Sequence, residues 1–166
     1  MKTLRSSLFA LVCAAFVSAN AAALDVGEPA PSFALPTTAG DTVRLEQLRG
    51  KAVYVDFWAS WCGPCRRSFP WMNEMQRRYG SQGLAIVAVN VDKKRDDAAR
   101  FLGEVPAEFT VVYDPPGATP AAYAVKAMPS SFLIDARGTV VAIERGFREE
   151  SGAALEQRIR ALVSPR

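Results

Sequence analysis

Residues 53–65 read VYVDFWASWCGPC, and the organisation of the rest of the chain follows from them. The first six residues form an apolar, β-prone run, interrupted by one aspartate, of the kind found in strands that are covered on both faces. Gly63-Pro64 then turns the chain, and a helical pattern begins at Cys65. The stretch therefore predicts a buried strand that leads into a pair of cysteines at the start of a helix.

The spacing of Cys62 and Cys65 suits thiol–disulfide exchange. With Cys62 at the helix N-cap, the two Cα atoms would lie roughly 5 Å apart, which a disulfide can bridge. Unpaired N–H groups at a helix N-terminus favour a thiolate, and only a thiolate attacks a disulfide. We expect an exposed Cys62 to be the nucleophile and a more buried Cys65 to resolve the mixed disulfide. A purely structural disulfide is disfavoured, because so short a loop gains little chain entropy.

The segment from Asp56 to Cys65 resembles the active-site segment of thioredoxins almost residue for residue, and Met128-Pro129 follows in the expected order. From about residue 25 to 163 the chain resembles exported thioredoxin-like proteins of the TlpA/ResA type. The resemblance implies an α/β thioredoxin fold, in which helices flank a central mixed β-sheet. It also implies an N-terminal β-hairpin extension and a central insertion between the two halves of the fold.

The order of elements can be predicted from apolar periodicity and turn residues. We expect a hairpin around Gly40-Asp41. The expected helices span residues 46–48, 65–79, 93–102, 120–125 and 151–163, and the later strands span residues 84–91, 109–113, 131–135 and 140–143.

Asp56 is the third predicted catalytic residue. A carboxylate in a buried apolar strand is costly and should have a raised pKa. Such a group can take the proton of Cys65 and return it, which is the role of the matching aspartate in thioredoxins. The alternative is a strand-end aspartate held by local hydrogen bonds.

The resemblance also implies a substrate-binding patch around Cys62. Pro129 matches the cis-proline that faces the dithiol, and Gly146 matches a glycine beside the substrate groove. An extended substrate could pair its backbone with residue 128. The expected patch consists of Trp61, Gly63, Pro64, Met128, Pro129 and Gly146.

Three positions depart from the related families. Ala88 stands where thioredoxin has a lysine near the aspartate, and Ser68 stands where many TlpA/ResA proteins have a glutamate. Ser130 replaces the glutamate that usually follows the cis-proline in proteins devoted to cytochrome c maturation, so this role is possible but not preferred.

Two alternative functions stay open. The peroxiredoxin signature would need proline at position 57 and threonine at position 61, where this chain has Phe57 and Trp61. A thiol peroxidase is therefore the second candidate enzyme. A binding or chaperone module that does not use its thiols is the third possibility.

The N-terminus has the pattern of a secretory signal. A basic start is followed by an apolar run from Leu8 to Val17 and by small residues. We expect residues 1–23 to be a signal peptide cleaved near residues 21–23, and residues 24–166 to form a single thioredoxin-like domain. An uncleaved membrane anchor is the less favoured alternative, and Cys13 falls within this segment.

Composition excludes several classes of function. The chain of 166 residues has no histidine and three cysteines, so it lacks the ligands of a zinc site or a Cys–His pair. Loss of Lys2 and Arg5 with the signal would leave 18 basic against 17 acidic side chains, a net charge of +1, which gives no argument for nucleic-acid or membrane binding. We expect a monomer with no bound cofactor and no metal.

The dipeptide between the cysteines bears on the direction of electron flow. Strong periplasmic oxidants place histidine there, whereas thioredoxin has the same Gly-Pro pair and is reducing, at about −270 mV. We therefore expect a periplasmic reductant of protein disulfides or metal-site cysteines. Such a reductant would receive electrons from a membrane carrier such as a DsbD-like protein.

Overall fold

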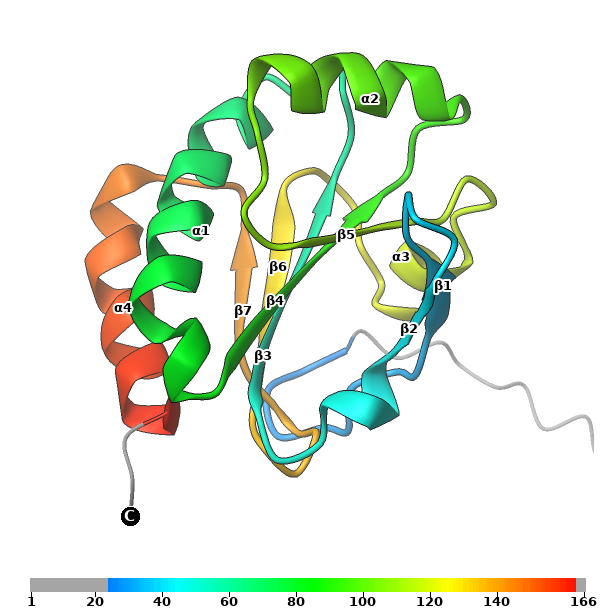
Figure 1. The fold of residues 1–166 in the computed structure, drawn as a ribbon. Helices are drawn as coiled ribbons and strands as arrows, with labels where there is room; N and C mark the ends of the chain where they lie inside the picture. The colour runs from blue at the N-terminus through cyan, green and yellow to red at the C-terminus, as the bar shows by residue number, and fades with distance from the viewer. Residues whose placement is uncertain (1–23, 164–166) are drawn as a thin grey trace, which may run out of the picture.

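The computed structural model describes residues 24–163 and is built on one five-stranded sheet (Figure 1). The strand order is β5-β4-β3-β6-β7. β3 pairs in parallel with β4, and β4 with β5, whereas β6 is antiparallel to both β3 and β7. The strands are β3 (Ala52–Trp58), β4 (Leu84–Asn90), β5 (Thr110–Tyr113), β6 (Ser130–Ile134) and β7 (Val140–Arg145).

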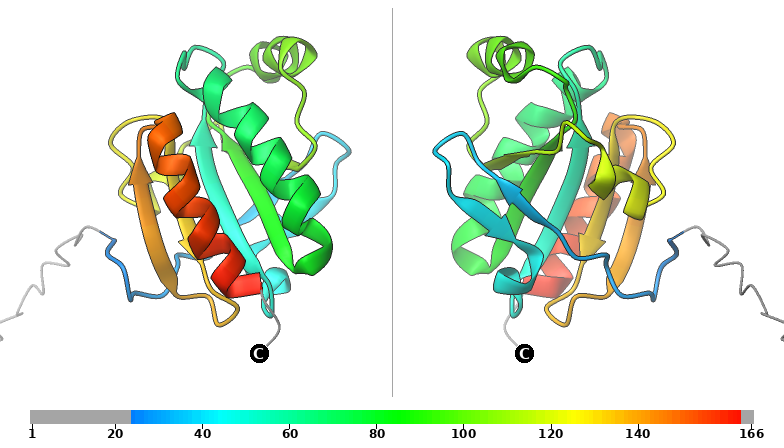
Figure 2. Two further views of the ribbon diagram at one scale, coloured as in Figure 1. Left: turned by 90° about the vertical axis from the view of Figure 1, so that its left-hand side faces the viewer. Right: turned by 90° about the vertical axis from the view of Figure 1, so that its right-hand side faces the viewer.

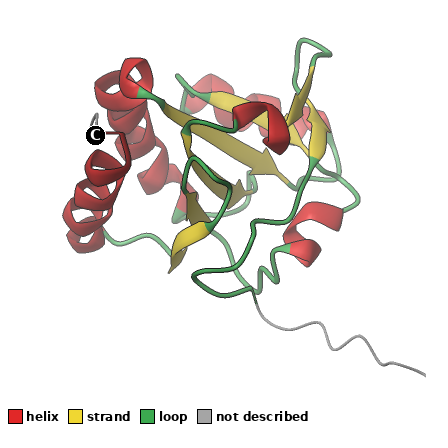
Figure 3. Ribbon diagram, turned by 90° about the horizontal axis from the view of Figure 1, so that it is seen from below, coloured by secondary structure: helices red, strands yellow, loops and turns green. Residues whose placement is uncertain are grey.

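Helices and a hairpin cover the two faces of this sheet (Figures 1 and 2). α1 (Cys65–Tyr79) and α4 (Glu149–Val163) lie on one face. The other face carries α3 (Ala118–Ala122) and the hairpin of β1 (Ala34–Pro36) and β2 (Thr42–Arg44), which leads into the short helix η1 (Leu45–Leu48). α2 (Arg95–Glu104) lies beyond the ends of β3 and β4, and η2 (Gly80–Gln82) follows α1. Seen from below, the strands lie between helices on either side (Figure 3).

β3 is buried along its whole length because both of its faces are covered. Tyr54 and Trp58 point to the α1 side, where they join a core cluster with Cys65 and Phe69. Val55 and Phe57 point to the hairpin side and pack in a second cluster. Alternation along a strand thus divides one apolar run between two cores, and Phe57 and Trp58 are core residues as expected.

The fold agrees with the sequence prediction, with small shifts at element ends. α1 spans the predicted residues 65–79. α3 starts at residue 118 and not at 120, because Gly117, with φ of 82°, allows the chain to enter the helix there. Ala124, at φ 52°, then prevents the helix from reaching the expected end at residue 125.

The predicted signal peptide and its cleavage site lie outside the described residues. Within residues 24–163, no helix combines the length and apolar character that a membrane span requires.

Candidate active site

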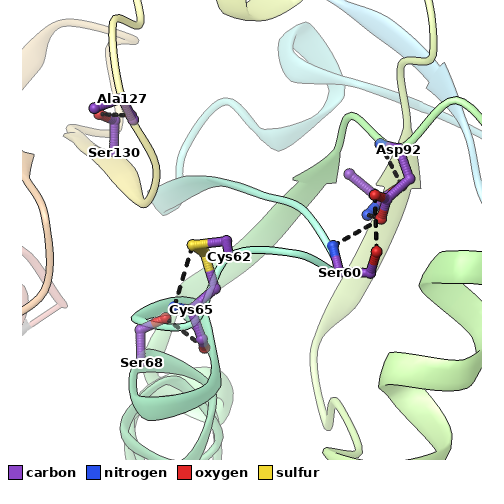
Figure 4. Close-up of a disulfide and its surroundings, with 8 residues drawn as sticks. Ser60, Cys62, Cys65, Ser68, Asp92, Ala127 and Ser130 are labelled. Carbon is purple, nitrogen blue, oxygen red and sulfur yellow. Dashed lines mark hydrogen bonds between the residues drawn. A yellow bond between two sulfur atoms is a disulfide. The ribbon is translucent and has the colours of Figure 1, made fainter.

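Cys62 and Cys65 form a disulfide just beyond the C-terminal end of β3 (Figure 4). Their Cα atoms are 5.4 Å apart, close to the predicted spacing. The prediction that Cys62 is the N-cap was wrong, because α1 begins at Cys65 with Pro64 as its N-cap. Residues 62–65 form a turn, closed by the Cys65 N–H donating to the Cys62 carbonyl oxygen over 3.1 Å. The same N–H lies 3.3 Å from Cys62 Sγ, so the helix N-terminus still faces this sulfur.

The expectation of an exposed Cys62 is corrected by the structure of the oxidised form. Cys62 retains only 4% of its surface, because the disulfide holds its sulfur against the core cluster that contains Cys65. Cys65 has no exposed surface. As expected, Cys65 is more buried than Cys62, and Cys62 is the cysteine of the pair that keeps some exposed surface.

Asp56 is buried to 1% exposure in the middle of β3, and its Oδ2 atom has no hydrogen-bond partner within the described part of the chain. Burial raises the pKa of Asp56 well above its ordinary value. Because side chains alternate along a strand, Asp56 lies on the same face as Tyr54 and Trp58, the face covered by α1. The alternative of a strand-end aspartate satisfied by local hydrogen bonds does not fit this environment.

Ala88 and Ser68, the two positions near the dithiol that differ from the related families, have uncharged side chains. Ala88 is the register partner of Asp56 on β4, so a methyl group stands directly beside the carboxyl. Ser68 is buried, and its hydroxyl donates to the Cys65 carbonyl oxygen over 3.0 Å. Asp56 has no ion pair among residues 24–163.

The loop before β6 has the predicted backbone geometry. The Met128–Pro129 peptide bond is cis. The Gly146 N–H donates to the Pro129 carbonyl oxygen over 2.8 Å, which joins two of the predicted patch segments. The Ser130 hydroxyl donates to the Ala127 carbonyl oxygen over 2.7 Å and closes this loop on itself (Figure 4).

The predicted patch residues differ in exposure. Trp61, Gly63 and Pro64 are exposed on the β3–α1 loop, and Trp61 exposes 71% of its surface. Met128 is half-buried and Pro129 is buried. Trp61 and Met128 line one common groove, whereas Gly63 and Pro64 do not line it.

Asp92, which is not among the predicted site residues, holds the β3–α1 loop in place. Asp92 is buried and accepts hydrogen bonds from the Ser60 N–H at 2.8 Å, the Ser60 hydroxyl at 2.9 Å and the Asn90 side-chain amide at 2.8 Å (Figure 4). The ends of neighbouring parallel strands meet at one edge of a sheet. The positions of Asp92 just after β4 and Ser60 just after β3 could therefore have predicted this contact.

This fold and this dithiol are those of the thioredoxin-like thiol–disulfide oxidoreductases. The chain belongs to the Redoxin family, whose model matches residues 25–158.

Named relatives agree with this class. Thiol-disulfide oxidoreductase ResA of Bacillus subtilis (strain 168) is 36% identical over 150 residues, which cover 87% of this chain and 84% of the relative. ResA of Geobacillus thermodenitrificans (strain NG80-2) is 40% identical over 124 residues, covering 75% of this chain and 71% of the relative.

Solved structures agree as well. A Chlorobium tepidum protein assigned as a thiol:disulfide interchange protein DsbE superposes with a TM-score of 0.82 at 56% identity, covering 86% of this chain and 100% of that one. The chain is thus a ResA/DsbE-like enzyme of thiol–disulfide exchange, and such an enzyme acts on protein disulfides.

Proposed function

We propose that this protein is a periplasmic reductant that transfers two electrons from its Cys62/Cys65 dithiol to disulfides of exported proteins. The observation that carries the proposal is the geometry at Cys62. Its sulfur lies 3.3 Å from the N–H nitrogen of Cys65, and Cys62 is the residue of the pair that keeps some exposed surface. A backbone N–H at a helix start stabilises a thiolate, which is the attacking form.

The exchange proceeds through two displacements at sulfur. The Cys62 thiolate attacks one sulfur of the substrate disulfide, which breaks and releases the other sulfur as a thiolate. The Cys65 sulfur then attacks Cys62 Sγ, forms the Cys62–Cys65 disulfide and releases the second substrate thiolate. The substrate gains two electrons and the dithiol loses two.

Cys65 must lose its proton before the second step, and we assign Asp56 as the proton acceptor. Its carboxyl lies on the α1 side of β3 and its pKa is raised by burial, which brings it closer to that of a thiol. Ala88 stands beside Asp56, so that position supplies no lysine ammonium ion to the proton transfer. Pro129, Met128, Gly146, Gly63 and Pro64 would shape the surface on which the substrate backbone lies.

The proposed direction and location rest on the sequence. Gly63-Pro64 places no histidine between the cysteines, so the reduced form gains no extra stabilisation from a neighbouring cation. The predicted signal peptide would direct the protein to the periplasm, and a DsbD-like membrane carrier would return electrons to the disulfide.

Trapping of mixed disulfides tests this function. In Cys65→Ala the second displacement cannot occur, so we expect covalent complexes with substrate proteins in the native host, released by dithiothreitol. Cys62→Ser is the matched control and should give no complexes. Equal labelling by both variants would contradict the assignment of Cys62.

Two measurements separate the alternatives. A thiol peroxidase would consume hydrogen peroxide rapidly at Cys62 in stopped-flow, whereas we expect a slow reaction. A thiol-independent chaperone would keep its effect in Cys62→Ser/Cys65→Ser. The reduction potential tests direction, since a value near −120 mV, as in a strong oxidant, would refute a reductant.

A further inference from the structure

An open groove of about 620 Å³ lies beside the dithiol, and its volume is within the range of ligand-binding clefts. Its walls come from the segment after β4, from α3 with the loop before it, and from the segment that leads to Pro129. Trp61 and Met128 belong both to this groove and to the patch around Cys62, so the groove is continuous with the place where a substrate disulfide reacts. The lining residues with apolar side chains are Trp61, Val91, Pro115, Pro120, Ala121, Val125, Ala127 and Met128.

The charge of the groove is positive. Among residues 24–163, Lys93 and Lys126 line it and no carboxylate does. The Lys93 ammonium donates to the Pro115 carbonyl oxygen over 2.6 Å, and exposed Lys126 has no ion pair among the described residues.

Asp92 and Asp114, which adjoin Lys93 and Pro115 in the sequence, do not line the groove, and both carboxylates are buried and already hydrogen-bonded to other groups. Asp92 is held by Ser60 and Asn90. Asp114 accepts hydrogen bonds from the N–H groups of Gly117 at 3.1 Å and Thr119 at 2.6 Å.

We propose that this groove binds the polypeptide segment that flanks the reactive cystine of a substrate protein. It would select segments in which a large apolar side chain stands beside an aspartate or glutamate. The inference rests on the proposed function and adds to it the class of substrate. The apolar walls bury the aliphatic or aromatic side chain, while Lys126 and Lys93 attract the carboxylate.

Size and position favour a peptide as the occupant. The groove is open and begins at Trp61, so a chain that is covalently attached to Cys62 during exchange can continue into it. Attachment makes this contact intramolecular, and even a weak contact then affects the rate. An exposed ion pair is worth enough to change a rate by about two- to fivefold.

Model disulfides test the inference. Peptides of one sequence, each joined through its cysteine to mercaptoethanol, would carry Leu-Glu, Leu-Gln, Leu-Lys or Ala-Glu beside the cysteine. The second-order rate constant for oxidation of the reduced protein is divided by that for dithiothreitol, which removes intrinsic differences between the peptides. We expect the normalised rate constant of Leu-Glu to exceed that of Leu-Lys about threefold or more at low ionic strength. The difference should shrink at about 0.5 M salt, where exposed charges are screened. Ala-Glu should react more slowly than Leu-Glu.

Variants assign the effect to the groove. Lys126→Glu should abolish the preference for Leu-Glu over Leu-Lys, because one carboxylate then offsets the charge of Lys93. Lys51→Glu makes the same change of net charge just before β3, at the opposite end of that strand from the dithiol, and should leave the order unchanged. Equal normalised rates of the wild-type protein for all four peptides, or the same loss of preference in Lys51→Glu, would overturn the inference.

Uncharged hydroxyethyl disulfide distinguishes this inference from the proposed function. If the reduced protein fails to react with it and with every peptide, the proposed function fails. If it reacts with hydroxyethyl disulfide but does not discriminate among the peptides, only the selectivity of the groove is refuted. The far-UV circular dichroism spectrum and the melting temperature of Lys126→Glu, compared with those of the wild type, show whether this variant is folded.

Discussion

Asp56 is a carboxyl group without a partner in the interior of the sheet. Its Oδ2 atom accepts no hydrogen bond in the described structure, and the neighbouring position on β4 is Ala88. Proteins rarely keep such a group, since leaving it unpaired costs about 1–3 kcal/mol or more. Its retention is explained if the proton transfer to and from Cys65 requires it.

The stability of the protein should therefore depend on pH through Asp56. Burial raises its pKa in the folded state above the value of about 3.9 in the unfolded chain. The folded state binds this proton more tightly, so ionisation costs stability as pH rises above about 4. In the oxidised form, Asp56→Asn should raise the free energy of unfolding by about 1–3 kcal/mol at pH 8. It should have little effect near pH 3, where the carboxyl is protonated in both states. Urea denaturation of both proteins at the two pH values measures the difference in the free energy of unfolding.

Asp135 is a control because its pKa is shifted in the opposite direction to that of Asp56. Although burial works against it, hydrogen bonds from Thr139 and Arg137 lower the pKa of Asp135. Its contribution to stability is present above the unfolded pKa and is lost as pH falls through the lower folded pKa, so Asp135→Asn should destabilise the protein more at pH 8 than near pH 3. If Asp56→Asn also slows disulfide reduction at neutral pH while stabilising the fold, the residue serves catalysis. An unchanged rate would remove its proposed role.

Trp61 exposes a large apolar ring at the edge of the dithiol. Trp61→Ala should leave the free energy of unfolding within about 0.5 kcal/mol of wild type, because little buried surface is lost. The kcat/KM for a protein disulfide should fall about tenfold, as for an aromatic anchor of an interface. Val26→Ala removes surface from the second large apolar residue that is exposed in the described part of the chain, and it should change neither quantity. An unchanged kcat/KM in Trp61→Ala would show that the ring makes no contact with substrate.

At the scale of elements, the β3–α1 loop is fixed from outside itself. Asp92 follows β4 and holds both the N–H and the hydroxyl of Ser60, which follows β3. The position of Cys62 two residues later depends on this link between adjacent strand ends.

Asp92→Ala should therefore cost about 2 kcal/mol of unfolding free energy, since buried donors of Ser60 and Asn90 lose their acceptor. The rate constant for oxidation of the reduced protein by hydroxyethyl disulfide should fall with it, and Asp92→Asn should restore part of both. Asp96→Ala, on the exposed first turn of α2, serves as the control. A loss of stability below about 0.5 kcal/mol in Asp92→Ala would argue against an anchoring role.

What the sequence predicts well are features that depend on neighbours along the chain. The apolar run before Cys62 and the periodicity after Cys65 located β3 and α1, and the resemblance to thioredoxins predicted the cis bond at Pro129. The burial of Cys62, the link from Asp92 to Ser60 and the groove beside Trp61 depend on which strand ends and loops meet in space. Local patterns do not contain that information.

At the scale of the whole molecule, β3 separates two cores that have different roles. The core on the α1 side contains both cysteines with Trp58 and Phe69, whereas the core on the hairpin side contains Phe33, Leu45 and Tyr123. Damage to the second core should therefore affect stability more than chemistry.

Phe33→Ala tests this separation. The change should cost about 3 kcal/mol of unfolding free energy through the cavity it leaves, and well below the melting temperature the rate with hydroxyethyl disulfide should stay within about twofold of wild type. Phe69→Ala, in contact with Trp58 and Phe101, should reduce both stability and rate. A loss of rate in folded Phe33→Ala equal to that in Phe69→Ala would show that the two cores are not independent.

In the segment between β5 and Pro129, Asp114 bonds to its own loop, and the Tyr123 hydroxyl ties the segment to the rest of the fold by donating to the Pro31 carbonyl oxygen over 2.8 Å. This segment forms much of one side of the groove yet contributes neither cysteine nor Asp56. Apart from Trp61, Val91 and Lys93, the residues of the proposed substrate preference are therefore encoded in a different stretch of the gene from the residues of electron transfer. A lineage could exchange one without retuning the other, and a protein engineer could graft residues 114–128 from a relative to redirect the enzyme toward new clients.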